Sequence, residues 1–144
     1  MKKAFAGCSM ALLLAVVASG QAAGTAQPMP GLDATVTKVE RAATASLRDC
    51  PPGSNTVTAV TRPGEQFALV TVAFKVAPTF KASPMKRPTM TDAADKRYNT
   101  ASTFVDVGSV PEYSCTFPFR VPDGTRLKAL QLESSSLDLS PLDK

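Results

Sequence analysis

The stretch RPGEQFALVTVAFKV, residues 62–76, decides the fold class of this chain. After Glu65, no charged residue occurs before Lys75. The part from Gln66 onward has 11 residues, whereas a helix that crosses a membrane needs roughly 20. Four of the 11 are β-branched and the apolar residues do not recur at helical spacing, so a helix is disfavoured. The stretch therefore predicts a β-strand.

The predicted strand has two unequal faces, because successive side chains of a strand point to opposite sides. One face is apolar throughout and holds Ala68, Val70, Val72, Phe74 and Val76. The other face holds Phe67, Leu69, Thr71 and Lys75 in that order. We expect the first face to be buried, and the second to be covered at its start and wet at its end. This pattern is typical of a central strand in a two-layer β fold.

The N-terminal segment has the layout of a secretory signal peptide. Lys2 and Lys3 precede an apolar run centred on MALLLAVVA, which ends in the small residues QAA. We expect cleavage at the end of residues 1–23, which excludes them from the fold and leaves no transmembrane anchor. Cys8 lies in FAGC, which has the shape of a lipoprotein acceptor box. The apolar core follows Cys8 instead of preceding it, so we assign Cys8 to the discarded peptide.

The remaining length and charge point to one domain that does not bind nucleic acid. Removing 23 of the 144 residues leaves 121, which suits a single core. Lys2 and Lys3 account for two of the 16 Lys and Arg residues, so the mature chain would carry 14 of them against 12 Asp and Glu. A nucleic-acid-binding protein would need a clustered basic face.

The mature chain keeps two cysteines, Cys50 and Cys115. An even count in an exported protein predicts a disulfide, because compartments outside the cytoplasm are oxidising. In the chain-entropy model, closing this loop of about 65 residues stabilises the fold by about 4 kcal/mol. The alternatives are two free thiols or a bridge to another chain. Without a C-x-x-C motif, a redox-active role is not indicated.

Turn signals separate about seven predicted strands. Besides the opening stretch, the strands are LDATVTKVER (32–41), TVTAV (56–60), a TMTDAADKRYNT hairpin (89–100), STFVDVG (102–108), YSCTFPFRV (113–121) and RLKALQLES (126–134), with a further pairing around 137–139. An edge segment is expected around residues 79–81. We expect an all-β, immunoglobulin-like sandwich over residues 32–139. Residues 24–31 predict a flexible lead-in and residues 140–144 a C-terminal tail.

The segment YSCTFPFRV places Cys115 on the apolar face predicted for the core. Pro118 falls on the opposite face, which indicates an edge strand or a bulge because proline cannot donate a ladder hydrogen bond. Tyr113 lies two residues before Cys115, the spacing of the tyrosine corner in antibody domains. The chain has no Trp, so a tyrosine at a strand start is the simpler interpretation.

Three ordered segments carry a resemblance to a known family. They are PGEQFALVTVAFKV (63–76), TMTDAADKRYNT (89–100) and CTFPFRVPDGTRLKALQLE (115–133). Their order resembles the telokin-like immunoglobulin-fold domains of exported bacterial proteins, a family of domains of unknown function. The resemblance covers Leu32–Glu133 and implies a sandwich without catalytic residues. The Pro-rich segment Pro78–Pro88 departs from it, replacing a polar stretch after the central strand.

The residues for common catalytic and metal chemistry are missing. The chain contains no His, which removes the commonest general base and the commonest neutral metal ligand. Asp92 and Asp95 supply too few oxygens for calcium, which takes about six to eight. Met85 and Met90 lack a third ligand for copper(I). We therefore expect no enzymatic activity, no cofactor and no metal.

One basic cluster remains, which we call the basic rim: Lys81, Lys86, Arg87, Lys96 and Arg97, together with Tyr98. If its two loops are neighbours, it could meet an acidic protein, a lipid head group or a polyanionic glycan. The alternative is a solvated basic edge that prevents strand pairing.

Together these features favour an exported, non-catalytic β-sandwich, periplasmic or secreted. It would bind a protein or an envelope component through loops or an edge strand. The alternative is a small protein inhibitor of an exported hydrolase, because a rigid sandwich with Pro-rich loops can present one of them to an active site.

Overall fold

The structure is a computed structural model that describes residues 24–47, 50, 57–100, 105–107 and 110–144. The predicted signal peptide, residues 1–23, lies outside the described residues. The described strands are β1 (Thr25–Met29), β2 (Leu32–Ala42), β3 (Thr44–Leu47), β4 (Val57–Val60), β5 (Glu65–Val76), β6 (Ser83–Met85), β7 (Thr89–Asp92), β8 (Arg97–Asn99), β9 (Val105–Val107), β10 (Glu112–Pro122), β11 (Leu127–Leu132) and β12 (Ser135–Asp138). Within this part of the chain, no helix has the length and apolarity needed to span a membrane.

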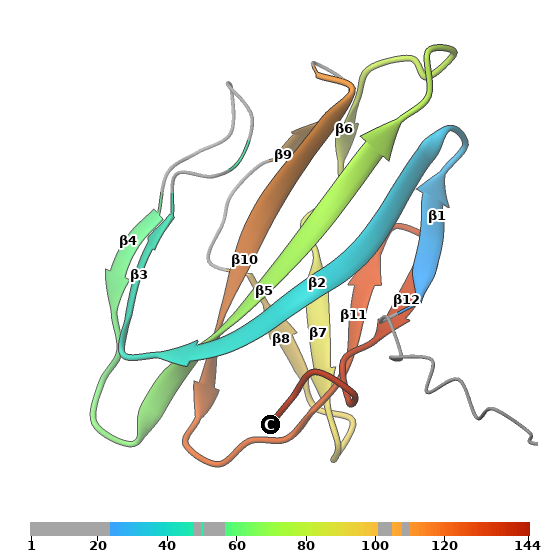
Figure 1. Cartoon of the computed structure of the whole chain (residues 1–144). Coiled ribbons are helices and arrows are strands. Elements are labelled where there is room, and N and C mark those ends of the chain that lie inside the picture. The colour runs from blue at the N-terminus through green and yellow to red at the C-terminus, as the bar shows by residue number, and fades with distance from the viewer. Residues whose placement is uncertain (1–23, 48–49, 51–56, 101–104, 108–109) are drawn as a thin grey trace, which may run out of the picture.

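Eight of these strands form two antiparallel sheets that lie one behind the other as a β-sandwich (Figure 1). One sheet has the strand order β1-β2-β5-β10, and the other has the order β12-β11-β7-β8. Two short ribbons, β3-β4 and β6-β9, complete the described strands. The predicted all-β sandwich is confirmed. The strands that the sequence did not indicate are β1, β3 and β6.

β5 is an inner strand with the two faces predicted for it. Val70 and Val72 are fully buried on the first face, and Phe67 is fully buried at the start of the second face. Lys75 is exposed at the far end of that second face. Pairing with β2 on one side and β10 on the other provides partners for the backbone polar groups of β5. An almost uncharged strand can lie inside the molecule for this reason.

β10 supplies two of the large aromatic residues of the core. Phe117 and Phe119 are fully buried, and Phe117 meets Phe74 edge-on with ring centroids 6.4 Å apart. β10 is the last strand of its sheet, with an isolated bridge from Thr100 to Phe119 beyond it. The edge position predicted from Pro118 is therefore confirmed.

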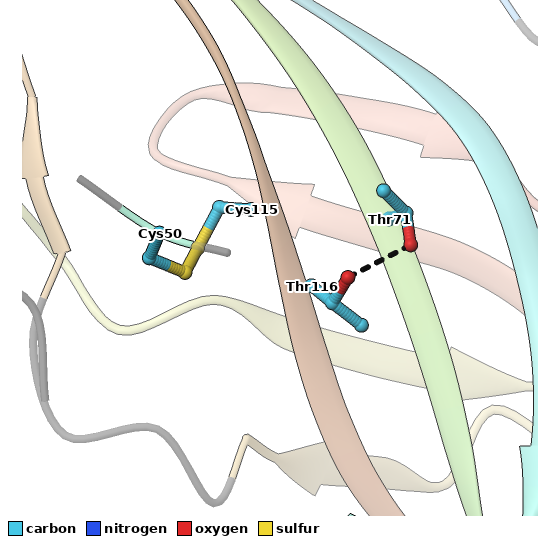
Figure 2. The surroundings of a disulfide bond; sticks show 4 residues. All are labelled: Cys50, Thr71, Cys115 and Thr116. Atoms are coloured by element: carbon cyan, nitrogen blue, oxygen red, sulfur yellow. Dashed lines mark hydrogen bonds between the residues drawn. A yellow bond between two sulfur atoms is a disulfide. The ribbon is translucent and has the colours of Figure 1, made fainter. Parts of the chain in front are cut away.

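The predicted disulfide joins Cys50 to Cys115 (Figure 2). Cys115 is fully buried on β10, while Cys50 lies beyond β3 and packs against the core. The disulfide therefore joins the segment that follows β3 to β10, the edge strand of the β1-β2-β5-β10 sheet. Thr116 and Thr71 share a hydrogen bond of 2.9 Å between their hydroxyls, which links β10 to β5 beside the bridge (Figure 2).

The prediction of a flexible lead-in over residues 24–31 is wrong, because most of it forms the edge strand β1. This strand pairs with β2, and the hydroxyls of Thr25 and Thr35 lie 2.8 Å apart. Pro28 is accommodated because an edge strand needs hydrogen bonds on one side only and a bulge interrupts the ladder. The small and Pro-rich composition concealed this strand.

Residues 140–144, predicted as a tail, belong to the fold. Leu142 and Asp143 donate their backbone N–H groups to the Leu139 carbonyl, at 3.0 and 3.1 Å, and so form a turn. Leu142 packs against the core, and the Asp143 side chain is only 9% exposed.

The edge segment expected around residues 79–81 does not form. A strand forms later in the chain instead: it is β6, which pairs with β9.

Candidate functional site

Two recesses of ligand size open near opposite ends of β5. The apolar recess has a volume of about 370 Å³ and is lined by Met29, Pro30, Thr79, Phe80, Lys81 and Ser83. The basic recess has a volume of about 330 Å³ and is lined mainly by Arg41, Gln66, Thr125, Arg126, Asp143 and Lys144. Because a strand rises about 3.3 Å per residue, the two recesses lie on the order of 30 Å apart along β5.

The apolar recess forms where the β1–β2 turn packs on the β5–β6 loop. Gly31 has a φ of +82°, which allows the tight turn between β1 and β2. Its carbonyl accepts the Ala77 N–H at 2.8 Å, and the Ala77 carbonyl accepts the Phe80 N–H at 2.9 Å. A Cβ atom at Gly31 would lie 3.5 Å from the Cβ atoms of both Ala77 and Phe80. The walls of the recess are thus held by backbone contacts.

The basic recess forms where three chain segments meet beside the end of β2. Arg41 donates from Nη2 to the Thr125 carbonyl at 2.8 Å and forms an ion pair with Asp143. The second carboxylate oxygen of Asp143 accepts the Leu127 N–H at 2.7 Å. Gly124, with a φ of +74°, closes the β10–β11 turn that carries Thr125. Arg41 therefore ties β2, this turn and the C-terminal turn together.

The structure does not bring the predicted basic rim into one patch. Lys96 and Arg97 lie at the turn of the β7–β8 hairpin. Lys86 and Arg87 precede the opposite end of β7, and Lys86 forms an ion pair with the β11–β12 turn. Lys81 lines the apolar recess. The two loops of the proposed rim are thus separated by the length of β7.

Tyr98, the remaining rim residue, belongs to a part-buried hydrogen-bond cluster. Its hydroxyl donates to Asp92 Oδ2 at 2.9 Å, and Asp92 Oδ1 accepts the N–H groups of Ala94 and Lys96, each at 2.9 Å. Asp92 is only 8% exposed. Burial alone would raise the pKa of Asp92, but the two backbone N–H groups and the Tyr98 hydroxyl hold it below its ordinary value. Asp92 is therefore a structural anchor of the hairpin.

We expect this cluster to make the fold sensitive to acid. The folded-state pKa of Asp92 lies below its ordinary value of 3.8. Its contribution to the free energy of unfolding is therefore complete above that value and is lost as the pH falls through the folded-state pKa. The free energy of unfolding can be measured with urea at a series of pH values from about 7 to about 2. Over this range it should fall further in the wild type than in Asp92→Asn. Equal losses in the two proteins would show that other carboxylates carry the acid dependence.

The side chains that the sequence offered as candidate metal ligands make ion pairs or core contacts in the structure. Asp95 forms an ion pair of 2.5 Å with Lys128, between carboxylate and ammonium. Met85 and Met90 are 4% and 0% exposed and belong to the core. Among the described residues, no group of three or more His, Cys, Asp or Glu side chains could hold a metal ion.

Sequence reasoning missed the residues of the basic recess. Arg41 and Asp143 are 102 positions apart, and Thr125 lies between them in the chain. The available signals were local and weak: Arg41 ends a predicted strand, and Arg126 follows the PDGT turn. Only the folding of three distant segments onto one end of the sandwich places these side chains together.

The fold and the recesses define a disulfide-linked, all-β sandwich with a recess near each end of β5. No family model matches the chain, and no curated protein matches it. Among solved structures, it is similar to an uncharacterized β-sandwich protein from Clostridium difficile 630. That likeness has a TM-score of 0.48 and 8% sequence identity, and it covers 77% of this chain and 83% of the other.

Proposed function

We propose that this protein is an exported, non-catalytic binding module that engages a protein or an envelope component through its apolar recess. The observation that carries the proposal is the pairing of Phe80 and Lys81 in one recess, a half-buried aromatic ring beside an exposed cation. Export to the periplasm or beyond and kinship with the telokin-like domains are parts of the same proposal. The N-terminal sequence and the disulfide support export.

The apolar recess offers two complementary kinds of contact. Met29 and Phe80 pack partly against the core and leave apolar surface at the recess. A methionine can adjust its shape to an incoming group. In the described part of the chain, none of the ion pairs includes Lys81. We infer that the occupant is an apolar side chain of the partner that adjoins an acidic group.

The recess is also held in shape before binding. The backbone hydrogen bonds of Gly31, Ala77 and Phe80 connect its two walls. A preformed recess loses little conformational freedom when it is occupied, which favours binding. The alternative function, inhibition of an exported hydrolase, rests on the Pro-rich loops alone. No contact among the described residues favours it over the binding module.

Crosslinking followed by capture tests the proposal. The oxidised chain of residues 24–144 is incubated with an envelope extract from its own source, and enriched proteins are quantified. We expect one enriched partner with the wild type. Lys81→Glu should reduce the enrichment at least about tenfold, because two negative groups would then face each other. Arg126→Glu, in the basic recess, makes the same change in net charge; it is the matched control and should retain the partner.

A partner retained equally by Lys81→Glu would contradict the assignment of the apolar recess. No enriched partner at all would remove the support for a binding module of this kind. If the partner is a hydrolase, its activity should be unchanged by the captured protein. A stoichiometric loss of that activity would establish the inhibitor alternative instead.

A further inference from the structure

We propose that the basic recess binds a phosphoryl group, at a site distinct from the partner site at the other end of the sandwich. The recess is lined by polar and charged side chains from β2, β5, the β10–β11 turn and the C-terminal turn. Its volume of about 330 Å³ is close to the lower limit for small-molecule sites. A phosphoryl group attached to a small molecule is of suitable size.

Arg41 is held in place before any ligand arrives. Its Nη2 donates to the Thr125 carbonyl at 2.8 Å and contacts Asp143. The side chain is 23% exposed and lines the recess. These contacts keep the guanidinium group beside the recess, so that a rotation of the group is enough to present a donor to an entering anion. Guanidinium groups also match the oxygens of phosphate better than ammonium groups do.

Arg41 retains a donor that nothing in the described structure uses. Its Nη1 is buried without a hydrogen-bond acceptor, although nearly all buried donors in folded proteins have one. The two oxygens of Asp143 are engaged by Nη2 of Arg41 and by the Leu127 N–H. Because Nη1 is covered by other atoms, the guanidinium has to turn toward the recess to offer this donor. An oxyanion in the recess would supply the missing acceptor.

Arg126 also lines the basic recess, but it comes from a different chain segment than Arg41. It follows the β10–β11 turn, is exposed, and takes part in none of the described ion pairs. Lys144 adds an ammonium group, so three positive side chains line the recess against one acidic side chain, that of Asp143. A tetrahedral phosphoryl group presents oxygens in several directions and can engage two guanidinium groups at once. A planar carboxylate matches one guanidinium, and we therefore favour the phosphoryl group.

Isothermal titration calorimetry with inorganic phosphate tests this site. The chain of residues 24–144 is titrated near neutral pH at constant ionic strength, with acetate as the comparison anion. We expect saturable phosphate binding by the wild type. Arg126→Gln should weaken it at least about tenfold, since a charge-assisted hydrogen bond is lost. Arg126 is exposed, so this variant should fold normally. Lys81→Gln, in the apolar recess, is the matched control and should bind phosphate like the wild type.

Three results would overturn the proposal: no saturable phosphate binding, equal affinity for acetate, or an unchanged phosphate affinity in Arg126→Gln. A parallel sedimentation with phosphatidylglycerol vesicles identifies the source of the phosphoryl group. Vesicle binding that phosphate displaces would indicate a lipid head group, and phosphate binding without vesicle binding would indicate a soluble phosphorylated molecule. Because the envelope capture depends on Lys81 and this titration on Arg126, either proposal can fail without the other.

Discussion

The double variant Cys50→Ala/Cys115→Ala should have a free energy of unfolding about 4 kcal/mol below that of the wild type. The two cysteines are 65 positions apart. A bridge across a loop of this length restricts the unfolded chain, and its loss returns that freedom. The effect is large because a domain is stable by only about 5–15 kcal/mol in total. Urea unfolding followed by far-ultraviolet circular dichroism measures it.

A reductant provides the control for this variant. Dithiothreitol should lower the stability of the wild type to that of the double variant and leave the double variant unchanged. A loss below about 1 kcal/mol would contradict the prediction, because it would mean that the bridge barely restricts the unfolded chain.

Phe117→Ala should lower the free energy of unfolding by about 3–5 kcal/mol. The Phe117 ring is fully buried on β10 and meets the ring of Phe74 edge-on. Its removal leaves a cavity between the two sheets, and close-packed neighbours can relax into such a cavity only in part. The same urea unfolding, with the disulfide intact, measures the loss.

Val60→Ala is the matched control for the core variant. Val60 is 65% exposed, so its truncation should change the free energy of unfolding by no more than about 0.5 kcal/mol. A Phe117→Ala loss as small as that of Val60→Ala would show that the inner face of β10 does not form the core.

The central strand could be predicted because its burial follows from local alternation. Val70 and Val72 are buried and Lys75 is exposed, as the period of two required. The disulfide could be predicted because only one internal pairing of Cys50 and Cys115 exists. The edge strand β1 could not, because its Pro-rich sequence becomes a strand only beside β2, which supplies the hydrogen-bond partners.

The residues that come together at the candidate sites were harder to predict from the sequence. The basic rim joined residues that are close in sequence, from Lys81 to Tyr98, but β7 separates its two loops and Tyr98 turns inward to Asp92. The basic recess joins residues that are far apart in sequence, such as Arg41 and Asp143. In a β-sandwich, proximity in sequence is a poor guide to proximity in space, since long strands such as β2, β5 and β10 carry the chain far across the sheet within 11 or 12 residues.

The sequence alone determined the all-β class, the faces of the long central strand and the pairing of Cys50 with Cys115. These depend on side-chain alternation, β-branched composition and cysteine count, all of which are properties of short segments or of the chain as a whole. Tertiary structure alone decided that Lys81 joins an apolar recess and that Arg41 and Arg126 share a basic one. Each recess forms from turns that meet only when the strands pair in register, and no short segment of sequence specifies such a meeting.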